Sequence, residues 1–127
     1  MTDMRTPRRR ARGLGAAGSG SMHFWMQRVT AIANVPLVIF LLSLLVALIG
    51  LGHEAARSYI ANPLVGIMLI LLVVSGAFHM RLGMQVIIED YIHSPAIKMA
   101  CLVGNILFSA AIGIACIYAV LRTSLGS

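Results

Sequence analysis

Charged side chains are scarce in this chain of 127 residues. Asp, Glu, Lys and Arg make up 11% of it, whereas hydrophobic residues make up 59% and the mean hydropathy is +0.91. In soluble domains about a quarter of the residues are charged and about half are apolar. The composition therefore excludes an ordinary soluble domain and indicates an integral membrane protein of one domain.

Cysteine is also nearly absent, since the chain has only Cys101 and Cys116. They fall on one expected helix, about 20 Å apart along its axis, so they cannot form a disulfide with each other. Two cysteines are too few for the four thiolates that hold an iron–sulfur cluster. The segment 13–18 matches the spacing GxGxxG, but it follows no expected strand and indicates a flexible linker instead of a nucleotide site.

Three long apolar runs stand out, at about 29–51, 63–88 and 96–121. Each exceeds the roughly 20 residues that a helix needs to cross a bilayer. We therefore predict an all-α membrane protein with three transmembrane helices. The pairs Asn62-Pro63 and Ser94-Pro95 place a capping residue before a proline, which predicts the starts of the second and third helices. Pro36 either bends the first helix or marks its start; in the latter case 29–34 lies at the membrane surface.

Positive charge predicts the orientation of the spans. Six arginines precede the first span, whereas the following loop has Arg57 beside Glu54. The six are Arg5, Arg8, Arg9, Arg10, Arg12 and Arg28. This bias places the N-terminus in the cytoplasm and, after three crossings, the C-terminus in the periplasm.

The distribution of arginines and apolar runs divides the chain into a basic flexible tail (1–22) and a three-helix membrane domain (23–127). The run Arg8-Arg9-Arg10 is also compatible with a twin-arginine signal or a nucleic-acid patch. About 23 apolar residues follow it, however, which is too long for the core of a signal peptide, so it indicates a topology signal. We expect the inner (cytoplasmic) membrane of a bacterium; a mitochondrial inner membrane is the less favoured setting.

One histidine, His79, lies deep inside the second apolar run. At about 100° per residue, Gly76 and Gly83 fall near the same face of the helix. Glycines one turn away on either side let a flat macrocycle approach the backbone, as an axial haem ligand requires. Two other interpretations remain open: a hydrogen bond that packs two helices together, and a proton relay or ion site.

Asp90 and Tyr91 follow at the cytoplasmic end of the same helix. They lie about 16 Å beyond His79, at the membrane surface. A phenol there can donate a hydrogen bond to the carbonyl of a ligand, and the adjacent carboxylate can orient it. An ordinary helix end with an interfacial tyrosine explains the pair equally well.

The string from His79 to Asp90-Tyr91, with Arg28-Val-Thr30-Ala-Ile before the first span, resembles one family. It is similar to the small D-type membrane-anchor subunit of succinate dehydrogenase, respiratory complex II, over residues 23–121. The resemblance implies haem b with His79 as an axial ligand of the iron. It also implies a ubiquinone site, with Tyr91 at the quinone and Asp90 beside it.

Further roles follow from the same resemblance. Arg28 resembles an arginine near the haem propionates, although a topology-setting charge explains it nearly as well, and Gly83 would pack against the haem. The implied partners are a second, C-type membrane-anchor subunit, an iron–sulfur subunit and a flavoprotein subunit. The chain itself would be non-catalytic, passing electrons from succinate to quinone only as part of the complex.

Arg81 departs from the family pattern. Some relatives have an apolar or aromatic residue there, and Arg81 should point to the side opposite His79. It must either extend its charged end to the membrane surface or pair with a group that the sequence does not reveal. The alternative function is a small transporter or channel subunit with a polar path along His79, Arg81, Gln85 and Asn105. A third possible function is that of an assembly or scaffold protein, which would tolerate the loss of His79.

Overall fold

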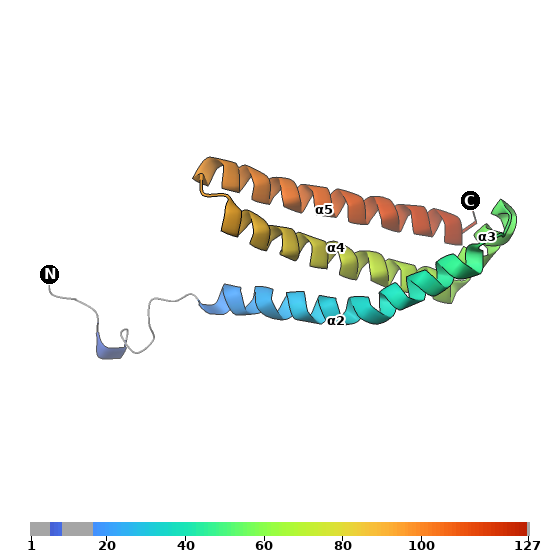
Figure 1. The fold of residues 1–127 in the computed structure, drawn as a ribbon, viewed down its shortest axis with the longest axis horizontal. Coiled ribbons are helices and arrows are strands. Elements are labelled where there is room, and N and C mark those ends of the chain that lie inside the picture. The colour runs from blue at the N-terminus through green and yellow to red at the C-terminus, as the bar shows by residue number, and fades with distance from the viewer. Residues whose placement is uncertain (1–5, 9–16, 127) are drawn as a thin grey trace.

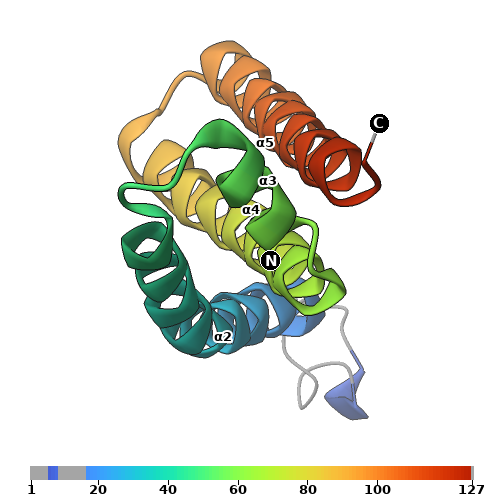
Figure 2. The ribbon, with the colours of Figure 1, turned by 90° about the vertical axis from the view of Figure 1, so that its right-hand side faces the viewer.

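The chain folds into long helices in a computed structural model that describes residues 6–8 and 17–126, with side chains at 6–8 and from residue 20 onward. The helices are α2 (Ala17–Leu48), α3 (His53–Ile60), α4 (Pro63–Tyr91) and α5 (Pro95–Ser124). Figures 1 and 2 show the three long helices side by side, with α4 between the other two. α4 packs against both α2 and α5 and is therefore the central element of the fold.

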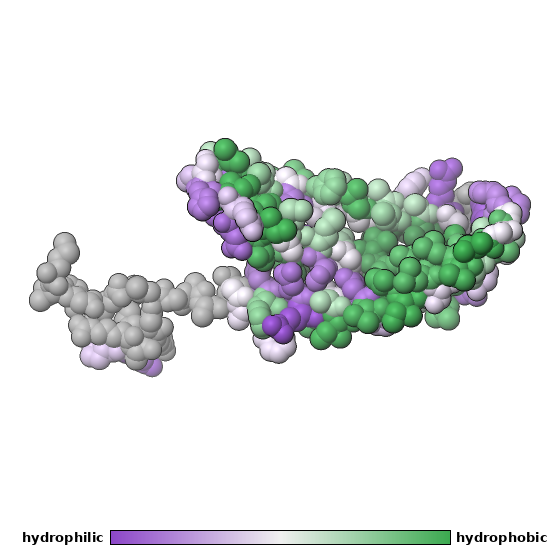
Figure 3. Space-filling view, viewed as in Figure 1, coloured by the Kyte–Doolittle hydropathy of each residue, from purple (hydrophilic) through white to green (hydrophobic). Residues whose placement is uncertain are grey.

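The three predicted spans are confirmed as helices. Gly20–Leu48, Pro63–Tyr91 and Pro95–Ser124 are long and apolar enough to cross a membrane. In Figure 3, hydrophobic side chains cover much of the bundle and hydrophilic ones gather at both ends. At one end the hydrophilic side chains also reach inward along the N-terminal half of α2.

α2 is one continuous helix of 32 residues with Pro36 inside it. Pro36 therefore does not mark the helix start, and 29–34 is part of the helix instead of a separate surface segment. Figure 1 shows α2 changing direction about midway, which is the effect expected of a proline that lacks a backbone N–H and crowds the preceding turn.

The helix also begins earlier than the apolar run predicts, at Ala17. Hydropathy detects where a helix enters lipid, and a helix can continue past that point into water. The predicted tail 1–22 thus overlaps the first turns of α2. Residues 1–5 and 9–16 of that tail, which include Arg5, Arg9, Arg10 and Arg12, lie outside the described residues.

The other two long helices begin where the prolines predict. The side chain of Asn62 accepts a hydrogen bond from the backbone N of Leu64 at 2.9 Å, with Pro63 at the first helical position. Ser94 precedes Pro95 in the same way, but its side chain makes no capping bond. There the prediction of a side-chain cap is wrong, and the first turn is closed by the backbone bond from Lys98 N to Ser94 O at 2.8 Å.

The short helix α3 lies in what the sequence predicts as a plain loop, 52–62. It is too short and too polar to give an apolar run, although Glu54 in its first turn and the pair Ala55-Ala56 favour a helix. The hydroxyl of Ser124 donates to the carbonyl of Ile60 at 3.2 Å and ties the end of α3 to the end of α5.

The interior is small. The buried apolar side chains of the described chain are Leu37, Leu44, Leu82 and Ile88, and the buried polar ones are Thr30 and Ser109. Most apolar side chains face outward, as expected for helices whose solvent is lipid. Any site that must be shielded from its surroundings therefore needs walls that these helices do not supply.

Candidate functional site

His79 lies in the middle portion of α4, on the side that faces α2. It follows Pro63 by sixteen residues and precedes Tyr91 by twelve, which places it about 18 Å from the C-terminal end of the helix. The imidazole is half-buried, and its Nδ1 lies 3.1 Å from Oγ1 of Thr30 on α2. The prediction of a histidine held deep in the span is therefore confirmed in its position.

Thr30 is the centre of a small polar cluster between α2 and α4. Its hydroxyl oxygen also lies 2.8 Å from the carbonyl of Met26 and 3.1 Å from that of Gln27. The hydroxyl of Ser75 on α4 donates to the backbone carbonyl of Thr30 at 3.4 Å. The sequence analysis did not find this cluster, although Gln27, Thr30 and Asn34 form a polar stripe at helical spacing that would have indicated it.

Asn34 continues this stripe one turn further along α2. Its side-chain oxygen is buried and accepts no hydrogen bond from the described residues. A buried acceptor without a donor is uncommon in folded proteins. The described residues therefore leave the hydrogen bonding of Asn34 incomplete.

The two glycines that flank His79 are not required by packing inside the chain. A Cβ at Gly76 would meet nothing within 4 Å, and one at Gly83 would lie 3.6 Å from Nε2 of Gln27, an ordinary contact. The buried Gly66 differs, because a Cβ there would come within 2.7 Å of Oγ of Ser124 on α5. The open space at Gly76 leaves room for a group from outside the chain, and the ordinary contact at Gly83 does not require a glycine.

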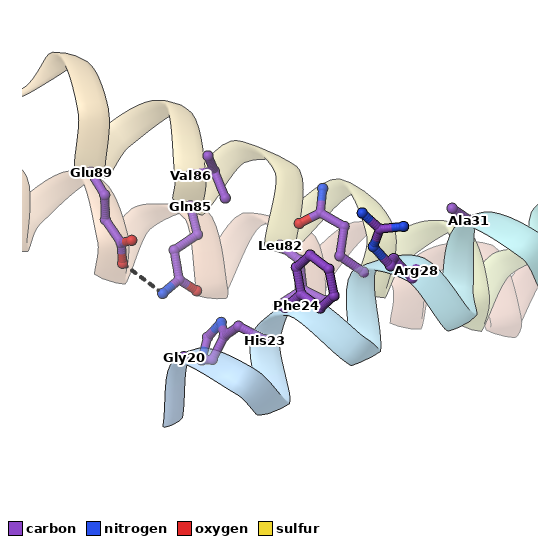
Figure 4. A pocket seen from close by; sticks show the side chains of 10 residues that line it. Gly20, His23, Phe24, Arg28, Ala31, Leu82, Gln85, Val86 and Glu89 are labelled. Carbon is purple, nitrogen blue, oxygen red and sulfur yellow. Dashed lines mark hydrogen bonds between the residues drawn. The ribbon is translucent and has the colours of Figure 1, made fainter. Parts of the chain in front are cut away.

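A pocket of about 660 Å³ lies between α2 and the C-terminal half of α4. This volume is in the range of ligand sites. It is lined by residues of both helices: Gly20, His23, Phe24, Gln27, Arg28, Ala31, Leu82, Gln85, Val86 and Glu89. Figure 4 shows Gln85 and Glu89 on the α4 side of the pocket and His23 on the α2 side.

Polar contacts fix several side chains of this pocket. Nε2 of Gln85 donates to a carboxylate oxygen of Glu89 at 2.8 Å, and the guanidinium of Arg28 lies 4.3 Å from the centre of the Phe24 ring, over its face. The sequence analysis singled out Arg28, but it did not single out His23 or Glu89 as site residues. Nothing in the apolar pattern marks these two, because they lie at the ends of their spans, where polar residues are ordinary.

Tyr91 and Asp90 lie apart from this pocket. Tyr91 is the last residue of α4 and is 78% exposed, and Asp90 is also exposed. Neither lines the pocket between α2 and α4. Both side chains are exposed at the C-terminal end of α4. Next to them, Nζ of Lys98 donates a hydrogen bond to the backbone carbonyl of Glu89 at 2.9 Å.

Arg81 lies on the other side of α4, against α5, as the helical period predicts. Together with Phe78 and Ser109 it lines a pocket of about 270 Å³. Its Nε is buried and has no hydrogen-bond partner among the described residues. The amide of Asn105 on α5 donates to the backbone carbonyl of Arg81 at 2.9 Å. Arg81 and Asn105 thus lie at the interface of α4 with α5, whereas His79 lies at the interface of α4 with α2. This arrangement does not favour one polar path through all three.

His79 belongs to no cluster of metal-ligating side chains in the described part of the chain. Within 6–8 and 17–126, no three His, Cys, Asp or Glu residues come together in a way that could hold a metal ion. The imidazole offers one ligand, and no such cluster of described residues supplies the other ligands of an iron bound there.

Comparison with known proteins gives consistent matches. Residues 2–119 match the family described as succinate dehydrogenase/fumarate reductase transmembrane subunit. The succinate dehydrogenase hydrophobic membrane anchor subunit of Paracoccus denitrificans is 32% identical over 122 residues, which are 96% of this chain and 94% of that protein. The protein of the same name from Rickettsia bellii (strain RML369-C) is 34% identical over 118 residues, 93% of this chain and 94% of the relative.

A third relative matches over a shorter stretch. The succinate dehydrogenase membrane anchor subunit of Reclinomonas americana is 36% identical over 78 residues, 59% of this chain and 65% of that protein. No solved structure gives a significant match.

Proposed function

Because this chain belongs to the family of succinate dehydrogenase/fumarate reductase transmembrane subunits, we propose a role for each part of the site between α2 and α4. The chain is a non-catalytic membrane-anchor subunit of succinate dehydrogenase. In the proposal it supplies one axial ligand of haem b, through His79, and part of the wall of a ubiquinone site near Tyr91.

The haem role rests on one observation. His79 is a half-buried imidazole in the middle of an apolar helix. Of the two glycines near its face, Gly76 lies next to open space and Gly83 has only an ordinary contact with the Gln27 side chain. Iron in haem takes a neutral imidazole nitrogen as axial ligand. The bound haem would supply a one-electron carrier, and its second axial ligand would come from the C-type anchor subunit.

Arg28 suits the haem propionates. It lies two residues before Thr30 on α2 and lines the pocket toward the C-terminal end of α4. A guanidinium pairs well with anionic carboxylates near a membrane boundary. Its contact with Phe24 holds it on this side of α2.

The quinone role is assigned to the end of α4. The exposed hydroxyl of Tyr91 is free to donate to a ubiquinone carbonyl, and Asp90 lies beside it. Because Tyr91 is open to its surroundings in this chain, the other walls of the quinone site must come from the partner subunits.

The proposed topology follows from the arginines before α2. It places the N-terminus and the end of α4 in the cytoplasm and the C-terminus in the periplasm of a bacterial inner membrane. The iron–sulfur and flavoprotein subunits then dock on the cytoplasmic side, next to Tyr91, and electrons from succinate reach quinone there.

The test of the haem role compares two histidine variants in the purified complex. His79→Ala should abolish or shift the b-type band in the reduced-minus-oxidised spectrum, because the iron loses a ligand. His53→Ala, which changes an exposed histidine of α3, should leave the band unchanged. Succinate oxidation with an artificial acceptor, measured in membranes, checks that the complex has assembled. An unchanged band in His79→Ala would overturn the assignment.

A further inference from the structure

We propose that Thr30 is a positioning residue that holds His79 in the tautomer with its proton on Nδ1, which leaves the lone pair of Nε2 for the haem iron. This inference rests on the proposed haem role of His79. It concerns a residue on a different helix, whose hydroxyl would not touch the haem.

The argument depends on where one hydrogen atom points. The Thr30 hydroxyl has a single hydrogen, and its oxygen lies 2.8 Å from the Met26 carbonyl, 3.1 Å from the Gln27 carbonyl and 3.1 Å from His79 Nδ1. Carbonyl oxygens only accept hydrogen bonds. If the hydrogen pointed at Nδ1, two oxygens would face each other at 2.8 Å with no hydrogen between them.

The other arrangement satisfies the shortest contact and the ring together. The hydroxyl donates to the carbonyl of Met26, and its oxygen accepts a hydrogen bond from Nδ1–H of His79. A neutral imidazole has one N–H, so a proton on Nδ1 leaves Nε2 unprotonated and able to bind a metal. The hydrogen-bond network thus assigns the tautomer that an axial ligand needs.

The chain of hydrogen bonds also fixes the direction of the ring. It runs from His79 through Thr30 to a backbone carbonyl of α2, and such chains polarise and strengthen each other. Ser75 holds the backbone of Thr30 from α4 at 3.4 Å. Metal-binding histidines usually donate their second N–H to such a partner, and its loss typically costs about 10- to 100-fold in metal affinity.

The experiment uses the purified complex and three threonine variants. Thr30→Val removes the hydroxyl at nearly constant shape, and Thr30→Ser keeps the hydroxyl. Thr123→Val is the matched control, because the Thr123 hydroxyl makes the same kind of bond, to the Ala119 carbonyl at 2.9 Å, on exposed α5. The measurements are haem loss to excess apomyoglobin, the haem midpoint potential and the electron paramagnetic resonance spectrum of the oxidised haem.

We expect Thr30→Val to lose haem about 10- to 100-fold more readily than the parent complex, with a changed potential and resonance spectrum. Thr30→Ser and Thr123→Val should match the parent in all three measurements. If Thr30→Val matches the parent, or if Thr30→Ser is as impaired as Thr30→Val, the proposal is overturned. In the second case packing by the methyl group, and not the hydroxyl, would hold the ring.

The design separates this inference from the haem role itself. If His79→Ala keeps the b-type band, the haem role fails and the Thr30 inference fails with it. If His79→Ala loses the band while Thr30→Val behaves as the parent, only the inference about Thr30 fails. Should Thr30→Val not assemble, Thr30→Ala takes its place against Thr30→Ser, and equal rates of haem loss in these two would refute the inference.

Discussion

The substitution Gly83→Ala should affect the stability of the chain and its affinity for haem in different ways. The added methyl group would lie 3.6 Å from Nε2 of Gln27, which is an ordinary contact. In a helix interior, alanine is favoured over glycine by about 1 kcal/mol. For the chain alone, the substitution should therefore be neutral or slightly stabilising.

A haem on His79 reverses this expectation. Gly83 follows His79 by four residues and lies one turn away on the same face of α4. A methyl group added to a well-packed contact costs about 1–3 kcal/mol. Since about 1.4 kcal/mol is a factor of ten, haem affinity should fall by about 5- to 150-fold.

The assay measures the haem content of the purified complex and the amount of the anchor subunit in membranes. Gly104→Ala is the control, because a Cβ at Gly104 meets nothing within 4 Å and Gly104 lies on α5, not on the helix that carries His79. We expect normal amounts of the subunit in both variants and haem loss only in Gly83→Ala. Normal haem retention in Gly83→Ala would show that the haem does not pass over this turn.

Two further predictions concern the ends of the bundle. Tyr91→Phe should slow succinate-to-ubiquinone turnover and leave succinate oxidation with an artificial acceptor intact, because only a hydrogen bond to quinone is removed. The control Tyr118→Phe, near the far end of α5, should affect neither assay. Equal loss of both activities in Tyr91→Phe would contradict the quinone role of Tyr91. Gly66→Ala would bring a Cβ within 2.7 Å of Ser124 Oγ and break the hydrogen bond from that hydroxyl to the Ile60 carbonyl. In thermal unfolding, the complex with Gly66→Ala should therefore be less stable than the complex with Gly104→Ala by about 1 kcal/mol. If the contact with Ser124 is the cause, Gly66→Ala combined with Ser124→Ala should be no less stable than Ser124→Ala alone, and additive losses would refute it.

The spans could be predicted because a chain segment that crosses lipid is restricted to very few backbone structures. A backbone inside a bilayer must satisfy its own hydrogen bonds, so a long apolar run is sufficient evidence for a helix. The same reasoning fails outside the lipid. It did not predict that α2 begins at Ala17, or that His53–Ile60 forms a helix, because hydropathy measures the solvent of a segment and not its hydrogen bonding.

The site could be predicted in part for a similar reason. An imidazole in an apolar run is conspicuous, and the helical period alone places His79 and Arg81 on different sides of α4. The contact between His79 and Thr30 joins residues 49 positions apart, and no local pattern specifies such a pair. The pocket beside them needs both helices in place, so His23 and Glu89 became visible only in the fold.

The small interior of this chain has a consequence for how the cell controls its amount. With Leu37, Leu44, Leu82 and Ile88 as the buried apolar side chains of its described part, the subunit gains little packing from its own helices, and lipid provides no hydrophobic drive to hold them together. Most of its stability must then come from assembly. We expect membrane proteases to remove copies that find no partner, so that the supply of the complex is matched to its scarcest subunit without a separate regulator.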